Sequence, residues 1–146
     1  MGKNTLKLDT KGLEPLMRML SRLDEEVAKA TIEDALTKAA ERVQMDTHIA
    51  LNKTYLPAHG KYWTGQTAAS VVEDTTPRWE GQTAWVPVGF DFSRPGAGGY
   101  LISGTPKMDA DPMLNKMYRG KAYMREIQDE MFDAVNKKIQ EVWDAG

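Results

Sequence analysis

The sequence contains no cysteine. This absence excludes disulfides, thiolate metal sites and cysteine nucleophiles together, and it is compatible with folding in a reducing cytosol. No apolar run reaches the length of about 18 residues that a membrane span requires, and the first residues lack the apolar core of a signal peptide. We therefore expect neither secretion by that route nor a membrane-spanning helix.

A surplus of basic charge is also missing, because 19 Lys and Arg residues stand against 21 Asp and Glu residues, for a net charge of −2. Tight nucleic-acid binders usually carry a basic face that neutralises phosphates, and no basic stripe is visible in the sequence. The 146 residues, of which 41% are hydrophobic and 27% charged, are typical of one globular domain. We expect a single domain over residues 1–146.

The N-terminal region predicts a strand followed by a short helix. Leu6 and Leu8 alternate with polar neighbours over residues 5–9, which is the period of a half-buried strand. Apolar residues then recur at intervals of three and four over residues 13–23, which predicts an amphipathic helix. Pro15 is tolerable there because it lies in the first turn.

A long helix is predicted over residues 24–53 and an amphipathic helix at the C-terminal end. Asp24 is expected to cap the long helix, whose alanines favour helix formation and allow close approach of another element. Its inner stripe consists of Ala28, Ile32, Ala35, Leu36, Ala39, Val43 and Ala50. The C-terminal helix is marked by Met124, Ile127, Met131, Ala134, Val135, Ile139, Val142 and Trp143.

Between these helices the pattern predicts short antiparallel strands. Residues 69–76 and 83–88 resemble two strands of a hairpin that turns near residues 80–81, with Pro87 restricting the second to an edge or a bulge. The apolar run at residues 100–102 predicts a last strand. We therefore expect an α+β fold, in which a small antiparallel sheet packs against the long alanine-rich helix and helices are segregated to one face.

Two extended loops are predicted near residues 54–66 and 89–99, where proline and glycine interrupt the periodicity. Aromatic rings are frequent in these loops and on the predicted hairpin, and aromatic residues and arginine are enriched in protein interfaces. The residues predicted to form an interface are Tyr55, Tyr62, Trp63, Trp79, Phe90, Phe92 and Arg94.

The sequence offers no motif for a metal site. His48 and His59 have no HExxH frame, which favours a surface or packing role for each. Asp91, Asp109 and Asp111 supply oxygen donors but do not match an EF-hand loop, so a solvated turn is the favoured interpretation.

Motifs for phosphate binding and for a serine nucleophile are missing as well. The glycines of residues 94–99 lead into an apolar run instead of the Gly-Lys-Ser/Thr of a P-loop. Ser70 and Ser103 lack the G-x-S-x-G elbow. We therefore predict neither a catalytic residue nor a cofactor.

Several short motifs nevertheless occur in order along almost the whole chain. They are carried by Gly12, Leu13, Thr64, Gly65, Ser70, Tyr100, Gly104, Thr105, Pro112 and Leu114. Together with the long alanine-rich helix, this ordered set resembles the tail-completion or head-to-tail joining family, the minor tail proteins found in the neck of long-tailed bacteriophages. Ser103 stands where an acidic residue commonly precedes the Gly-Thr pair, and Met113 replaces a phenylalanine.

The resemblance implies a structural virion protein of the phage neck or tail that is assembled in the host cytoplasm and is not an enzyme. It implies a homo-oligomeric ring, with six copies favoured, that contacts connector or neck proteins on one side and tail-tube or terminator proteins on the other. DNA would pass through its lumen without specific binding.

Three alternatives remain at this point. Within the phage virion, the chain could be a tail-terminator subunit that caps the tail tube. From other classes, it could be a small hydrolase that uses His59 with Asp91. It could also be a nucleic-acid-binding module that uses Arg94, Lys107, Lys116 and Arg119.

Overall fold

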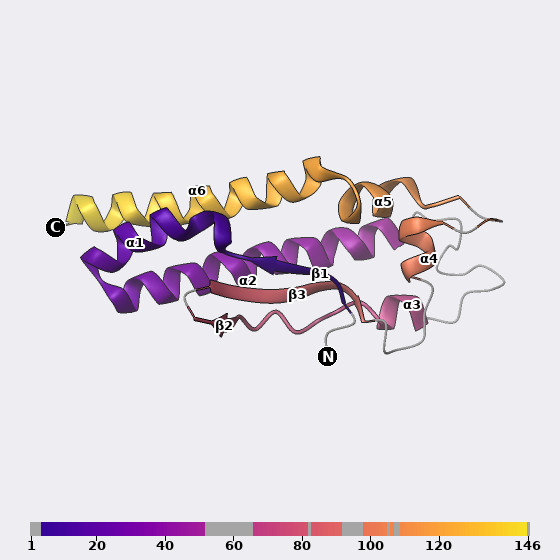
Figure 1. The fold of residues 1–146 in the computed structure, drawn as a ribbon, viewed down its shortest axis with the longest axis horizontal. Coiled ribbons are helices and arrows are strands. Elements are labelled where there is room, and N and C mark those ends of the chain that lie inside the picture. The colour runs from indigo at the N-terminus through magenta and orange to yellow at the C-terminus, as the bar shows by residue number, and fades with distance from the viewer. Residues whose placement is uncertain are drawn as a thin grey trace.

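The computed structural model describes residues 4–51, 66–81, 83–91, 98–104, 106 and 109–145. Within these ranges the elements follow one another as β1 (Asn4–Asp9), the 3-10 helix η1 (Lys11–Leu13), α1 (Glu14–Leu23), α2 (Glu25–Leu51), α3 (Gln66–Ala69), β2 (Arg78–Glu80), β3 (Thr83–Asp91), α4 (Gly98–Ser103), α5 (Pro112–Tyr118) and α6 (Lys121–Ala145). Figure 1 shows an elongated molecule in which α2 and α6 run along the long axis. Helices α3, α4 and α5 gather at one end, and α1 lies at the other.

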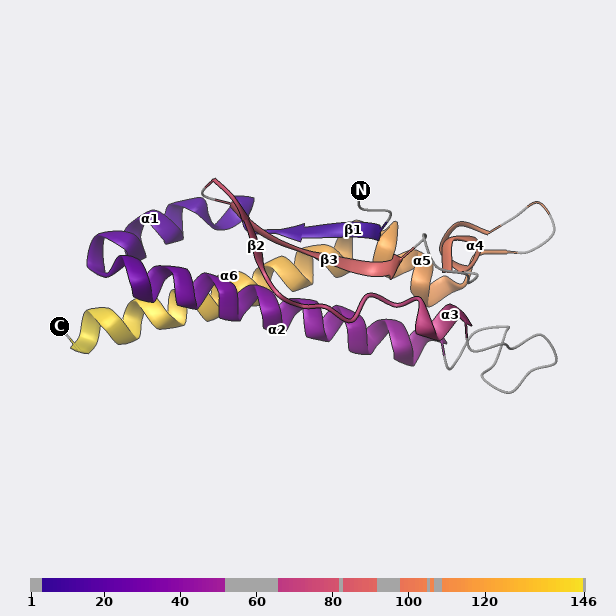
Figure 2. The same ribbon diagram turned by 90° about the horizontal axis from the view of Figure 1, so that it is seen from below.

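The sheet is antiparallel, with strand order β1-β3-β2, and the long helix α2 covers one of its faces (Figure 2). Because side chains alternate along a strand, Leu8 and its partner Val86 point toward the helices, whereas Lys7 and Trp85 lie on the opposite face. The Lys7 ammonium is 4.1 Å from the centroid of the Trp85 ring on this outer face. The predicted α+β fold, with a sheet against a long helix, is confirmed.

Helix α2 forms for the reasons that its sequence indicates. The Asp24 carboxylate accepts a hydrogen bond from the backbone N–H of Val27 at 3.1 Å, and Glu25 and Glu26 lie in the first turn, where the helix dipole favours negative charge. All seven residues of the predicted inner stripe are buried. The predicted helix boundaries of 24–53 differ only slightly from the observed Glu25–Leu51.

The flanking helices also agree with the sequence pattern, with one informative exception. Pro15 lies in the first turn of α1, as predicted. In α6 the buried positions include Ile127, Met131, Val135 and Ile139, but Trp143 is 69% exposed. Its assignment to the apolar stripe is wrong, because each step along a helix turns the side chain by about 100° and Trp143 follows the half-buried Val142 directly. Ala134, also assigned to the stripe, is exposed too.

The predicted last strand at residues 100–102 is wrong, because these residues form the helix α4. Gly104 ends it with a φ of 77°, and its N–H donates to the carbonyl of Tyr100 at 2.7 Å. The carbonyl of Leu101 accepts a hydrogen bond from the N–H of Asp111, also at 2.7 Å. A brief apolar run is compatible with a buried helix as well as a strand, and periodicity alone cannot separate them.

The predicted hairpin is correct in its turn but not in its first strand. The strand that precedes the turn and pairs with β3 across it is β2, and Gly81 in the turn has a φ of 64°, a conformation that glycine adopts readily. The predicted strand over 69–76 is reduced to an isolated bridge between Val71 and Phe90. The chain over residues 73–77 leaves the sheet before returning as β2.

Pro87 lies in the central strand β3, so its predicted placement at an edge is wrong. The reason lies in the alternation of backbone groups along a strand. Gly89 accepts from the N–H of Val72 and Asp91 donates to the carbonyl of Ser70, so odd-numbered residues of β3 turn their backbone groups away from β1. The backbone of Pro87 also faces away from β1, at a point between the bonds to residues 70–72 and the pairing with β2. Its missing N–H therefore costs the sheet no hydrogen bond.

The predicted loop near 89–99 overlaps regular structure at both ends, since β3 continues to Asp91 and α4 begins at Gly98; residues 92–97 lie outside the described residues. Phe90 is consequently fully buried, and its ring lies 6.2 Å from the ring of Tyr118, centroid to centroid. It belongs to the core beneath α5, and its prediction as an interface residue is wrong.

Truncation of this buried ring tests the packing directly. Phe90→Ala should lower the free energy of unfolding by about 3 to 5 kcal/mol, because it leaves a cavity in the core. Phe132→Ala, which shortens a side chain that is 44% exposed, should cost about 1 kcal/mol or less. Urea denaturation followed by circular dichroism measures both, and equal losses for the two variants would contradict the assigned burial.

Candidate functional site

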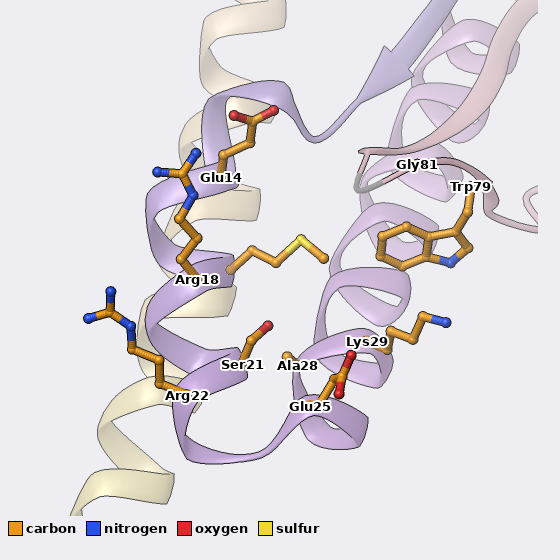
Figure 3. A pocket seen from close by; sticks show the side chains of 10 residues that line it. Glu14, Arg18, Ser21, Arg22, Glu25, Ala28, Lys29, Trp79 and Gly81 are labelled. Carbon is orange, nitrogen blue, oxygen red and sulfur yellow. The ribbon is translucent and has the colours of Figure 1, made fainter.

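A groove lies between α1, the first turns of α2 and the β2–β3 hairpin (Figure 3). Its volume is about 480 Å³. The residues that line it are Glu14, Met17, Arg18, Ser21, Arg22, Glu25, Ala28, Lys29, Trp79 and Gly81. This size is within the range of about 300 to 1,000 Å³ that is usual for sites that bind small molecules or single side chains.

The groove combines apolar and polar lining residues. Trp79 lies on the hairpin. It is half-buried, whereas its neighbours Arg78 and Glu80 in β2 are exposed, which indicates that its side chain faces the helices. Figure 3 shows Ser21 of α1 and Ala28 of α2 on the opposite side of the gap. The Lys29 ammonium lies 5.6 Å from the centroid of the Trp79 ring, which is a cation–π distance.

Five of the ten residues that line the groove are charged. Arg18, Arg22 and Lys29 contribute three positive charges, and Glu14 and Glu25 contribute two negative charges, each near the N-terminal end of a helix. No ion pair joins any of these five side chains to another residue of the described ranges. The guanidinium groups of Arg18 and Arg22 extend from the outer side of α1 in Figure 3, which makes the rim on that side basic.

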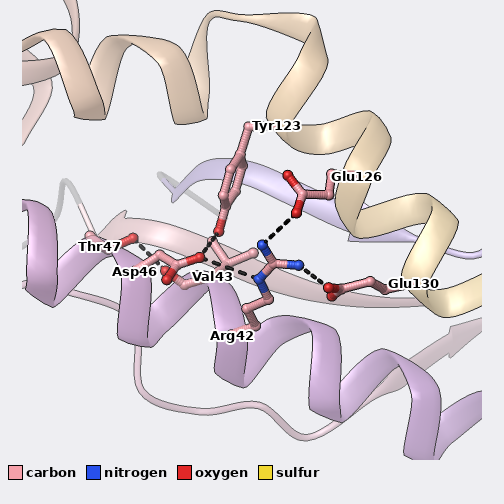
Figure 4. A network of polar contacts seen from close by, with 7 residues as sticks. All are labelled: Arg42, Val43, Asp46, Thr47, Tyr123, Glu126 and Glu130. Atoms are coloured by element: carbon pink, nitrogen blue, oxygen red, sulfur yellow. Dashed lines mark hydrogen bonds and ion pairs between the residues drawn. The ribbon is translucent and has the colours of Figure 1, made fainter.

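A polar network joins α2 to α6 (Figure 4). The guanidinium of Arg42 donates to Glu126 at 2.9 Å and to Glu130, and its Nε lies 3.5 Å from Asp46. The hydroxyl of Tyr123 donates to the same Asp46 carboxylate at 2.6 Å. The hydrogen bonds to Glu130 and Glu126 raise the pKa of Arg42, and burial followed by the bond to Asp46 raises the pKa of Tyr123.

A second polar contact lies deeper, between α2 and α5. The hydroxyls of Thr47 and Tyr118 are 2.6 Å apart, and Thr47 already donates to the carbonyl of Val43 at 2.7 Å. Tyr118 is therefore the donor in this pair. Burial raises the pKa of Tyr118 to about 12. Both networks hold helices together.

The structure brings two of the resembling motifs together at the α4–α5 end. The amide of Asn115 donates to the carbonyl of Ile102 at 2.9 Å, and Arg119 donates to the hydroxyl of Ser103 at 2.9 Å. These bonds join the segment of Tyr100 and Gly104 to the segment of Pro112 and Leu114. Tyr100 is 62% exposed, Leu114 is buried, and Pro112 occupies the first turn of α5.

The remaining motif residues are dispersed. Ser70 is buried beside α3, and its hydroxyl donates to the carbonyl of Thr67 at 2.7 Å. Gly12 is exposed and Leu13 is buried, and both border a small pocket with α6, away from the α4–α5 end. The predicted motif and interface residues outside the described ranges are Thr64, Gly65, Thr105, Tyr55, Tyr62, Trp63, Phe92 and Arg94.

The expectation that Asp111 lies in a solvated turn is wrong. It is buried, and its carboxylate caps α5 by accepting from the N–H of Leu114 at 3.0 Å. Among the described residues, no group of three or more His, Asp or Glu side chains could hold a metal ion. Asp91 ends β3, whereas His59, its partner in the hydrolase hypothesis, lies outside the described residues.

Sequence reasoning missed the groove and the exposed apolar side chains. The side chains of Met17 and Trp79 come from distant segments, so no local motif signals that they line one groove. Helix phase alone could have indicated the exposure of Trp143. The large apolar residues that are exposed in the described part of the chain are Met19, Met45, Ile49, Tyr100, Met113, Phe132 and Trp143.

The chain matches no protein-family model, no curated protein and no solved structure. Among the described residues, no helix is both long and apolar enough to cross a membrane.

The Arg42 network should make a measurable contribution to the seam between α2 and α6. Arg42→Met should lower the free energy of unfolding by about 1 to 2 kcal/mol, because it leaves Glu126, Glu130 and Asp46 without their shared cation. Lys38→Met is the matched control, since Lys38 forms one exposed pair with Asp34 on the same helix, and it should cost at most about 0.5 kcal/mol. The difference should shrink in high salt. Equal losses in urea denaturation would show that the network does not stabilise the seam.

The buried Tyr118 hydroxyl predicts a loss of stability at alkaline pH. Its pKa is raised from 10.0 to about 12, so the unfolded chain loses this proton before the folded chain does. Stability from this group is full below pH 10 and declines by up to about 2 kcal/mol as the pH rises toward 12. Tyr118→Phe should reduce the decline in denaturation curves measured across this window, with the exposed Tyr100→Phe as control. An unchanged decline in Tyr118→Phe would contradict the assignment.

Proposed function

We propose that the chain is a structural subunit of a bacteriophage neck or tail, which forms a ring that joins or completes the tail at its head-proximal end. The proposal starts from the ordered motifs in the sequence. It is supported by the contact between α4 and α5, since two of the motif segments are hydrogen-bonded to each other there.

The observation that carries the proposal is the distribution of exposed apolar side chains over two separate surfaces. Tyr100 and Met113 stand on α4 and α5, at one end of the long axis, where α2 also ends. Met19 and Trp143 stand on α1 and on the last turns of α6, at the other end. Contacts between subunits and contacts with another virion protein each require a surface, and exposed apolar side chains are typical of such contacts.

Within this proposal, six copies is the favoured number, and the ring would meet connector or neck proteins on one side and tail-tube or terminator proteins on the other. A tail-terminator subunit uses the same kind of ring at the end of the tail tube. The two roles differ in which virion component the ring requires for binding.

Electron microscopy of the purified protein tests the proposal, alone and after mixing with tails and heads from the phage whose genome carries the gene. We expect rings that attach to the head-proximal end of tails and increase the joining of heads to tails. Rings that stop tail-tube growth without promoting joining would favour the terminator role. A protein that stayed monomeric and bound neither tails nor heads would refute the proposal.

A further inference from the structure

We propose that the groove between α1, α2 and the β2–β3 hairpin receives Trp143 from a second copy of the chain, as the repeating contact between neighbouring subunits. This inference rests on the proposed ring and names the contact that builds it. It uses a cavity and an exposed side chain that none of the intramolecular contacts explains.

Trp143 has the properties of an inserted anchor. Its large apolar side chain is 69% exposed on the last turn of α6, where a second molecule can reach it. Tryptophan is the residue type most enriched among side chains that dominate interface energies. Because α6 packs along α2, the backbone that carries the Trp143 indole is positioned before binding, which reduces the conformational entropy lost on association.

Part of the groove lining suits an indole. Met17 and Trp79 belong to the apolar part of the lining, where a second indole would contact a thioether and an aromatic ring. Its volume of about 480 Å³ leaves room for one large side chain.

The charges next to the anchor and on the rim are also complementary. Asp144 directly follows Trp143, is exposed, and forms no ion pair with another described residue. On the groove side, Arg18 and Arg22 are equally exposed and equally without an ion pair in the described ranges. The Asp144 carboxylate of an incoming chain would be attracted to Arg18 and Arg22 on the outer side of α1 and repelled by Glu14 and Glu25, so these charges favour one orientation of the encounter.

The anchor and the groove are two different surfaces of one chain. Trp143 is not among the residues that line the groove and is 69% exposed, so the anchor lies outside the groove of its own chain. A contact between two different surfaces can repeat head to tail, and it closes into a ring when the rotation between subunits permits.

Photo-crosslinking from the anchor position tests this contact. Trp143 is replaced by the photoreactive aromatic residue p-benzoylphenylalanine, and the protein is mixed with an isotopically heavy wild-type chain before illumination. We expect crosslinks from position 143 to heavy peptides that contain Met17 or Trp79. Phe132, an exposed aromatic residue on the same helix, receives the same replacement as the control and should not reach these peptides. Crosslinks to another surface, or none above the control, would overturn the inference.

A charge exchange provides an independent measurement by sedimentation of the wild-type chain and its variants. Trp143→Ala should weaken self-association roughly tenfold to a hundredfold, as expected for an interface anchor. Arg22→Asp and Asp144→Arg should each weaken it, and the double variant should recover a large part of the loss. Unchanged association of Trp143→Ala, or a double variant weaker than both single variants, would overturn the inference.

The two proposals fail in distinguishable ways. Rings that form normally in Trp143→Ala would refute the anchor contact and leave the proposed function standing. Open chains of subunits that are crosslinked from position 143 to the groove would support the anchor contact and refute a closed ring.

Discussion

The fold depends on how much of α2 must be buried. Its inner stripe contacts β1 and β3 on one flank and α1, α5 and α6 on the other, so five elements share one helix surface. The buried face of α2 can contact all five elements because many of its residues are alanines. Ile32, Leu36, Val43 and Leu51 fill the wider spaces. Short side chains let neighbouring backbones approach, and the few large ones then fix which element lies where.

Polar groups within this packing fix the position of one helix along another. Thr47 is buried in the stripe, and it is tolerated because it bonds both to its own helix and to Tyr118. Arg42 lies at the margin of the stripe and bonds to Glu126 and Glu130, which are one turn apart on α6. An apolar seam alone would allow α6 to slide along α2, whereas a cation shared between fixed carboxylates defines one position. The end of α6 therefore projects from a defined place.

The sequence was sufficient for the parts of the fold whose pattern is long. The period of α2 extends over many turns, and its caps, stripe and approximate ends follow from local rules. It was insufficient where a pattern is short, because the apolar run at residues 100–102 suits a helix or a strand equally well. Phe90 illustrates a third case. An aromatic residue beside glycines is assigned to a loop until the pairing of β1 and β3 is known, and that pairing joins segments about 80 residues apart.

The candidate site could not be predicted from the sequence, for the same physical reason. Its residues come from α1, α2 and β2, and only the packing of the hairpin over the helix pair brings Trp79 to Met17. Once the groove and Trp143 are assigned to contacts between subunits, the other end of the molecule acquires a separate role. Tyr100 and Met113 stay exposed on α4 and α5, beyond the reach of a contact made at α1 and α6. In the proposed assembly, the end that carries the family-like motifs is therefore the surface left to bind another virion protein.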